Sequence, residues 1–248
     1  MDSEEKIIKL LEEKGNELLN EPPKNIKFTK NEEADKLLNN LKDFPHAFVL
    51  ACVMDRQIKA ERAWLIPYEI SKEIRSFKIS QLLKINQEEM KEIFERKSLH
   101  RFNKIMGENF YLAMQKIHND YRDDASNMWR DSPGSATLVK KFLEFRGIGI
   151  KIATMAANIL ARDFKIPMKD HVNIDISPDI QVKRVFERLG FISKNSSNEE
   201  LIYCARELNP EYPGIFDLPC WEIGRSWCRP NKPICEKCYL NDYCIKKL

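Results

Sequence analysis

The sequence predicts an all-α protein. Only eight of its 248 residues are glycine, and runs that alternate apolar with polar residues, as half-buried β-strands do, are scarce. Apolar residues recur instead at steps of three and four, which is the period of a helix with one buried face. A composition of 43% hydrophobic and 32% charged residues is typical of a globular protein. A chain of this length can form one large domain or two modest ones.

The N-terminal part of the chain predicts two helices of different kinds. Residues 4–19 are acidic and amphipathic, and Glu21-Pro22-Pro23 ends this segment. Its apolar stripe comprises Ile7, Ile8, Leu11, Leu18 and Leu19. Residues 47–54 (AFVLACVM) form the longest apolar run, which is shorter than the ~18 residues that span a bilayer. We therefore expect a buried helix there.

Three further signals mark expected helix starts. Pro67 is expected to begin a new helical turn rather than to interrupt a long helix. Asn86 with Glu89 has the form of a capping box, and so does Ser196 with Glu199. Each pair therefore predicts a helix whose first turn contains the glutamate.

Residues 138–160 predict two helices joined by the short turn Arg146-Gly147-Ile148-Gly149. Two glycines one residue apart permit unusual backbone angles and let a ligand approach the backbone closely. The free N–H groups at the start of the second helix form a site for an anion such as a nucleic-acid phosphate. The alternative interpretation is an ordinary corner between two helices.

The charge distribution favours the first interpretation. The net charge is only +3, but residues 140–165 contain six basic and two acidic residues. A basic stretch in a nearly neutral chain indicates one surface that faces a polyanion. Lys151 lies in this stretch, in the first turn of the second expected helix. It is either a solvated surface lysine or a nucleophile, since burial and a helix N-terminus both favour a neutral amine.

The last twenty-one residues hold four cysteines with the spacing C-x6-C-x2-C-x5-C. They are Cys228, Cys235, Cys238 and Cys244. Four thiolates in one short loop can bind zinc tetrahedrally or a 4Fe–4S cluster. Only one close pair is present, whereas zinc sites usually have two. The other three cysteines, Cys52, Cys204 and Cys220, are most simply small buried apolar residues.

Three separated motifs together resemble the helix-hairpin-helix DNA glycosylases. FRGIGIKIA (145–153) is similar to the family's L-P-G-V-G-x-K-T-A hairpin, and the cysteine spacing is that of the iron–sulfur loop in its endonuclease III branch. WEIGRSWC (221–228) resembles the segment that leads into this loop. The motifs follow the family's order, and the resemblance covers roughly residues 45–248.

The resemblance implies two helical lobes that flank a DNA-binding cleft. The first is a six-helix barrel over 45–163, with the hairpin at about 138–160. The second is a discontinuous helical domain over 1–44 and 164–248, which ends in a 4Fe–4S cluster loop at 228–244. The four cysteines would then ligate a 4Fe–4S cluster rather than zinc.

The resemblance also implies the reacting groups. Lys151 corresponds to the family's hairpin lysine, the nucleophile. The family's V-D-T-H-x-x-R-V pattern corresponds to IDISPDIQVKRV (174–185), in which Asp179 keeps the ungapped distance to Arg184-Val185 and becomes the catalytic carboxylate. Asp175 is the rival, because Ile174-Asp175 also resembles the V-D pair. The stretch lies farther from the lysine than in the family pattern, and Ile180-Gln181 replaces Thr-His.

DNA contacts are implied on both lobes. Gln57 occupies the place of a glutamine that enters the DNA stack in the family, although a plain surface glutamine fits nearly as well. The other expected contacts are Arg146, Gly147 and Gly149 of the hairpin and Arg229 and Lys232 of the cysteine loop.

The expected function is base-excision repair. The protein would flip a damaged or mismatched base out of double-stranded DNA and remove it, and Lys151 would add AP-lyase activity through a Schiff base. The alternatives are a glycosylase without lyase activity and a non-catalytic helix-hairpin-helix DNA-binding protein. We expect a monomer without membrane association. We also expect a cytoplasmic location, at the nucleoid in a prokaryote, because the N-terminus resembles neither a secretion signal nor a transit peptide.

Overall fold

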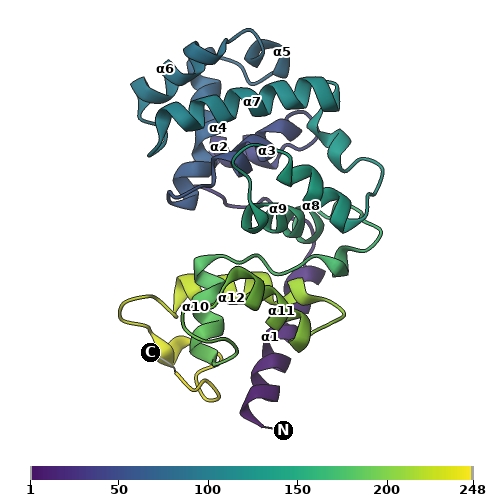
Figure 1. Ribbon diagram of the computed structural model, residues 1–248, viewed down its shortest axis with the longest axis vertical. Helices are drawn as coiled ribbons and strands as arrows, with labels where there is room; N and C mark the ends of the chain where they lie inside the picture. Colours follow the sequence, from purple (N-terminus) through teal and green to yellow (C-terminus); the bar gives the residue numbers. More distant parts are fainter. Residues whose placement is uncertain (1, 247–248) are drawn as a thin grey trace. The chain divides into compact units, whose positions relative to one another are not determined.

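The computed structural model describes residues 2–246, and within them every regular element is a helix (Figure 1). The all-α prediction is therefore confirmed. The α-helices are α1 (Ser3–Asn20), α2 (Glu32–Asn39), α3 (Pro45–Met54), α4 (Ala60–Ile74), α5 (Ile79–Leu82), α6 (Gln87–Lys97), α7 (Asn103–Tyr121), α8 (Ser135–Leu143), α9 (Ile150–Arg162), α10 (Ile180–Leu189), α11 (Asn198–Leu208) and α12 (Asp217–Ser226). Short 3-10 turns are η1 (Ala125–Met128), η2 (His171–Asn173), η3 (Pro213–Phe216) and η4 (Cys235–Lys237). Among the described residues, no helix is long and apolar enough to cross a membrane.

The chain divides into two compact units. Unit 1 comprises residues 2–23, 134–136 and 157–246, and unit 2 comprises residues 24–133 and 137–156. These limits differ from the predicted 45 and 163. Residues 24–44 group with unit 2 because they contain α2, which packs on α3 and α4. Residues 157–162 of α9 group with unit 1, where Arg162 faces Asp217.

Unit 2 is built around α3. All ten residues of this helix are buried, and α2, α4, α7 and η1 pack against it. Phe48 of α3 meets the rings of Trp64 in α4 and Phe142 in α8, at centroid distances of 5.6 and 6.4 Å. The apolar run 47–54 is thus the buried helix that its composition predicts, since a helix with no polar face must be covered on all sides.

Unit 1 joins the first helix of the chain to the last ones (Figure 1). The apolar stripe of α1 buries Ile7, Leu11 and Leu18, and this helix packs against η3 and α12. α10 packs along α12, and Phe186 in α10 meets Phe216 of η3 edge to face at 6.3 Å. The resulting core extends to the cysteine loop, whose Cys228, Cys238 and Cys244 pack against it.

One of the two predicted capping boxes is present, and the other is shifted by one residue. Asn86 and Glu89 form the expected reciprocal capping box at α6. The pairing of Ser196 with Glu199 is wrong by one residue, because the capping box of α11 consists of Ser197 and Glu200. The Ser196 N–H donates to the carbonyl of Ser193 and closes a turn before the helix. The two serines and two glutamates are adjacent, so the sequence fits both registers.

The prediction for Pro67 is also wrong. Pro67 lies inside α4, which continues through it from Ala60 to Ile74. Proline cannot donate to the carbonyl four residues earlier, and its position inside a helix is costly. Here Pro67 is buried together with Trp64, Ile66 and Ile70 on the face that α4 packs into the core. This packing outweighs the lost hydrogen bond.

Candidate nucleic-acid interface and reactive residues

The predicted hairpin is present, with α8 and α9 joined by residues 144–149. The Ile148 N–H donates to the carbonyl of Phe145 and closes the turn, and the Ile152 and Ala153 N–H groups donate to the carbonyl of Gly149. Gly149 is therefore the N-cap of α9, directly before its first residue Ile150. The first N–H groups of any α-helix have no carbonyl partner within that helix, so this end favours an anionic ligand.

The two glycines of the turn serve different purposes. Gly147 has a φ of +99°, and a Cβ there would lie 2.9 Å from Nδ2 of Asn109, a buried side chain of α7. Only glycine adopts this conformation without strain. Gly149 is exposed, and a Cβ there would meet no atom within 4 Å. The turn thus needs glycine at 147 for its own backbone, whereas the space above Gly149 is open.

Lys151, in the first turn of α9, is not a freely solvated lysine. Its Nζ lies 2.9 Å from Oδ2 of Asp55, the residue that follows α3. The Asp55 side chain is 5% exposed and that of Lys151 is 29% exposed, so the carboxylate is buried and the amine borders solvent. Sequence analysis missed Asp55 as a partner, since the two residues are 96 positions apart. The one sequence feature that points to Asp55 is its position, as a charged residue directly after an entirely apolar run.

Two other predicted DNA contacts of unit 2 lie on its surface. Gln57 is exposed and adopts a left-handed φ of +54° in the connection between α3 and α4. Arg146 is exposed as well, and its Nη1 lies 2.7 Å from Oε1 of Glu108 in α7. An exposed pair of this kind contributes little stability, so Arg146 can exchange Glu108 for another anion at small cost.

The two candidate carboxylates of unit 1 have different surroundings. Asp179 is the N-cap of α10, and its Oδ1 accepts a hydrogen bond of 2.8 Å from the Gln181 N–H. Asp175 instead forms a two-pronged ion pair with Arg206 of α11, at 2.7 and 2.8 Å. The guanidinium therefore occupies both oxygens of Asp175.

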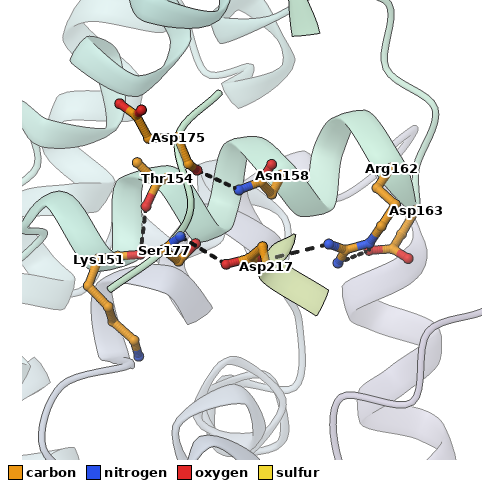
Figure 2. Close-up of polar contacts among 8 residues, drawn as sticks. All are labelled: Lys151, Thr154, Asn158, Arg162, Asp163, Asp175, Ser177 and Asp217. Carbon is orange, nitrogen blue, oxygen red and sulfur yellow. Dashed lines mark hydrogen bonds and ion pairs between the residues drawn. The ribbon is translucent and has the colours of Figure 1, made fainter. Parts of the chain in front are cut away.

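A polar network holds the segment that carries these carboxylates (Figure 2). The Ser177 N–H donates to Oδ1 of Asp217 at 2.9 Å, and Nδ2 of Asn158 in α9 donates to the carbonyl of Asp175 at 3.0 Å. The other oxygen of Asp217 lies 3.8 Å from Arg162, whose guanidinium also pairs with Asp163 at 2.7 Å.

Asp217 is the buried anchor of this network. Burial raises the pKa of its carboxyl, while the Arg162 guanidinium and the Ser177 hydrogen bond act in the opposite direction. Sequence analysis missed Asp217 because nothing around position 217 distinguishes it from a residue in the first turn of a helix. Its role depends on contacts with Ser177 and Arg162, which lie far earlier in the sequence.

The four clustered cysteines line one cavity of unit 1. Apolar side chains of α10 and α12, among them Val185, Leu189 and Ile223, complete its wall. None of the four is in a disulfide. Within residues 2–246, no three or more His, Cys, Asp or Glu side chains converge as the ligands of a single metal ion do. The cysteines thus share a space without closing on one point.

Two arginines of α10 hold the cysteine loop. Arg184 donates from Nε to the carbonyl of Cys228 at 2.7 Å and from Nη2 to the carbonyl of Gly224 at 2.8 Å. Arg188 donates from Nη1 to Sγ of Cys228 at 3.4 Å and to the carbonyl of Arg229 at 2.7 Å. Arg229 itself and Lys232 are exposed on the loop. The loop thus presents cations to solvent while α10 fixes its backbone.

Comparisons with known proteins agree with this architecture. Two solved structures, a non-covalent endonuclease III–DNA complex and a thermostable thymine-DNA glycosylase, each match with a TM-score of 0.64 at 17% identity. The first match covers 99% of this chain and 96% of that one, and the second covers 98% of both. The chain therefore has the fold of endonuclease III-like DNA glycosylases.

Sequence comparison finds similar proteins over a shorter stretch. Endonuclease III of Thermotoga maritima is 31% identical over 107 residues, which are 43% of this chain and 45% of that protein. Endonuclease III of Sulfolobus acidocaldarius is 28% identical over 100 residues, or 40% of each. The matches thus span less than half the length of these relatives. No family model matches the chain. The resemblance to the helix-hairpin-helix DNA glycosylase superfamily is confirmed.

The two glycines of the hairpin provide a matched stability test. Gly147→Ala should lower the free energy of unfolding by about 1–3 kcal/mol, because alanine is strained at positive φ. Gly149→Ala should lower it less, by at most about 1 kcal/mol, since the new methyl group meets nothing and only the preference for glycine over alanine at an N-cap is lost. Urea unfolding followed by circular dichroism measures both. Equal losses in the two variants would contradict this account of the turn.

Proposed function

We propose that this protein is a base-excision repair DNA glycosylase with AP-lyase activity. The observation that carries the proposal is Lys151, which lies in the first turn of the helix after a Gly-x-Gly hairpin, with its amine held by a buried carboxylate. The fold is that of endonuclease III-like enzymes. One solved relative, with a TM-score of 0.59 at 18% identity, is described as a trapped endonuclease III–DNA covalent intermediate.

The hairpin would bind the DNA backbone. Its exposed Gly149, the start of α9 and Arg146 suit a phosphate, and such contacts carry no sequence information. By the family resemblance, Gln57 would fill the gap left by an extruded base, and it is exposed in the connection between α3 and α4. Arg229 and Lys232 would add phosphate contacts from the cysteine loop. Backbone binding and base extrusion together expose the glycosidic bond.

Lys151 would carry the lyase step. The neutral amine attacks C1′ of the deoxyribose, and the base leaves with the electron pair of the glycosidic bond and takes up a proton. Opening of the sugar ring gives a Schiff base between Nζ and C1′. Loss of a proton from C2′ then expels the 3′ phosphate and breaks the strand. A glycosylase without this step would need no amine at position 151.

Asp179 would stabilise the positive charge that develops on the sugar as the base departs. We favour it over Asp175, since both oxygens of Asp175 are bound by Arg206. Asp179 caps α10, which fixes the position of its carboxyl.

The four cysteines would ligate a 4Fe–4S cluster. Each thiolate of such a cluster binds a different iron, so its ligands surround a space rather than a point. The cavity lined by the four cysteines fits that requirement. Hydrogen bonds to sulfur, such as the one from Arg188 to Cys228, also suit cluster thiolates. The cluster would be structural and would hold the loop for DNA.

We keep the predicted lobes, 45–163 and 1–44 with 164–248, as part of this proposal, together with a monomeric state and a location with the DNA. The alternatives are a glycosylase without lyase activity and a DNA-binding protein without catalysis. The next experiments separate them.

Borohydride trapping tests the nucleophile. Wild-type protein with duplexes that each contain one oxidised, deaminated or alkylated base, or an abasic site, should form a covalent complex with at least one of them. Lys151→Ala should form none, because the amine that gives the Schiff base is gone. Gel shift of the denatured complex measures this. Base excision without trapping would leave the monofunctional alternative, and trapping that persists in Lys151→Ala would exclude this lysine.

Replacement of the two carboxylates tests their assignment. Asparagine caps a helix as well as aspartate does, so Asp179→Asn should keep the cap of α10. It should excise the base about 100- to 1,000-fold more slowly, because the charge is lost. Asp175→Asn breaks only the pair with Arg206 and should keep activity near the wild-type rate. Single-turnover excision measures both. The opposite ranking would make Asp175 the catalytic carboxylate, and full activity in both variants would favour a non-catalytic protein or another carboxylate.

Metal analysis tests the cysteine site. The purified protein should contain iron and acid-labile sulfide, and Cys238→Ser should lose most of both because a thiolate ligand is missing. Cys204→Ser is the matched control, since Cys204 belongs to the same unit but does not line the cavity. Zinc in place of iron would overturn the cluster proposal, and equal losses in the two variants would overturn the ligand assignment.

A further inference from the structure

We propose that Asp55 is a positioning residue for Lys151. Its carboxylate holds the amine in place as an ammonium and so raises the pH at which the amine becomes a nucleophile. The inference deepens the proposed function and rests on it for its catalytic meaning. The contact itself lies wholly within unit 2.

The geometry of the pair is unequal. Asp55 follows the last turn of α3, a helix that is buried along its whole length, and its backbone N–H donates to the carbonyl of Cys52. Its carboxylate is thus fixed by the core and 5% exposed. Lys151 extends a flexible side chain from α9 to reach it at 2.9 Å. The rigid partner therefore determines where the mobile amine rests.

The charges of the site favour the ammonium form. An opposite full charge in direct contact stabilises a protonated amine. The N-terminus of α9 acts the other way, but it carries only partial charge. A buried carboxylate whose partner lost its charge would also be left uncompensated, which is costly. The contact with Asp55 therefore favours the ammonium form of Lys151.

Within unit 2, the titratable groups beside the pair are neutral or paired with each other. Burial, and after it the Asp55 carboxylate, raise the pKa of the Cys52 thiol in α3 well above its usual range, so this thiol stays neutral. Arg146 of the hairpin turn and Glu108 of α7 pair with each other at 2.7 Å. Asn109 of α7, which faces the turn, has no charge.

Chemical labelling of the DNA-free protein tests the proposal without any enzymatic activity. A small uncharged acylating reagent reacts only with neutral amines, and peptide mass spectrometry gives the rate at Lys151 as a function of pH. In Asp55→Asn, the half-maximal rate at Lys151 should move to lower pH, and labelling at neutral pH should rise at least about tenfold. Lys104, an exposed lysine of α7, is the internal reference and should not change.

Two controls make the outcome decisive. Asp55→Glu keeps a carboxylate and should stay closer to the wild-type profile than Asp55→Asn does. Asp55→Ser serves as the second neutral variant if Asp55→Asn unfolds, which thermal unfolding reports. An unchanged half-maximal pH would overturn the proposal, and so would a higher maximal rate at the same pH, since that indicates greater access alone.

Borohydride trapping on an abasic duplex connects the pair to the reaction. The pH profile of trapping should shift to lower pH in Asp55→Asn, while affinity for the intact duplex stays the same. A wild-type protein that traps nothing would refute the lyase activity, and the labelling result would still decide the role of Asp55. A trapping profile that does not move, in a protein that does trap, would refute that role.

Discussion

A buried charge has to be compensated, and Asp217 imposes this constraint on unit 1. Its carboxylate lies at the start of α12, where Arg162 from the end of α9 and the Ser177 N–H share its two oxygens. Three segments that are distant in sequence are thereby held together (Figure 2). Loss of Arg162 would leave the Asp217 carboxylate buried without an opposite charge. The loop that carries Asp175 and Asp179 consequently has a fixed backbone before any ligand arrives.

The same loop continues into α10, and side chains of this helix in turn fix the backbone of the cysteine loop. The helix begins at its cap, Asp179, and one turn later Arg184 grips the carbonyls of Gly224 and Cys228. Arg188, a further turn on, reaches Cys228 Sγ and the carbonyl of Arg229. One short helix thus sets the place of a proposed catalytic carboxylate and of a proposed cluster ligand. A shift of α10 would therefore move both the carboxylate and the cysteine.

Much of the fold could be predicted from the sequence, because the signals of a helix lie in residues that are close together in the chain. The stripe of α1, the apolar α3 and the capping box at Asn86 needed only nearby residues. The errors arose where tertiary packing decided, as at Pro67 inside α4. Side-chain partners were beyond reach for the same reason, since the contact of Asp55 with Lys151 depends on how α3 and α9 pack. Sequence patterns predicted individual site residues, whereas the contacts between side chains became visible only in the structure.

The contact between Asp55 and Lys151 also has a meaning for the history of such sequences. A chain that exchanged the lysine for an uncharged residue would retain a buried, unbalanced carboxylate at 55, which selection would tend to remove. The two positions are therefore expected to change together among descendants of a common ancestor. An acidic residue at the end of the apolar third helix would then mark, from sequence alone, those descendants that still keep the amine.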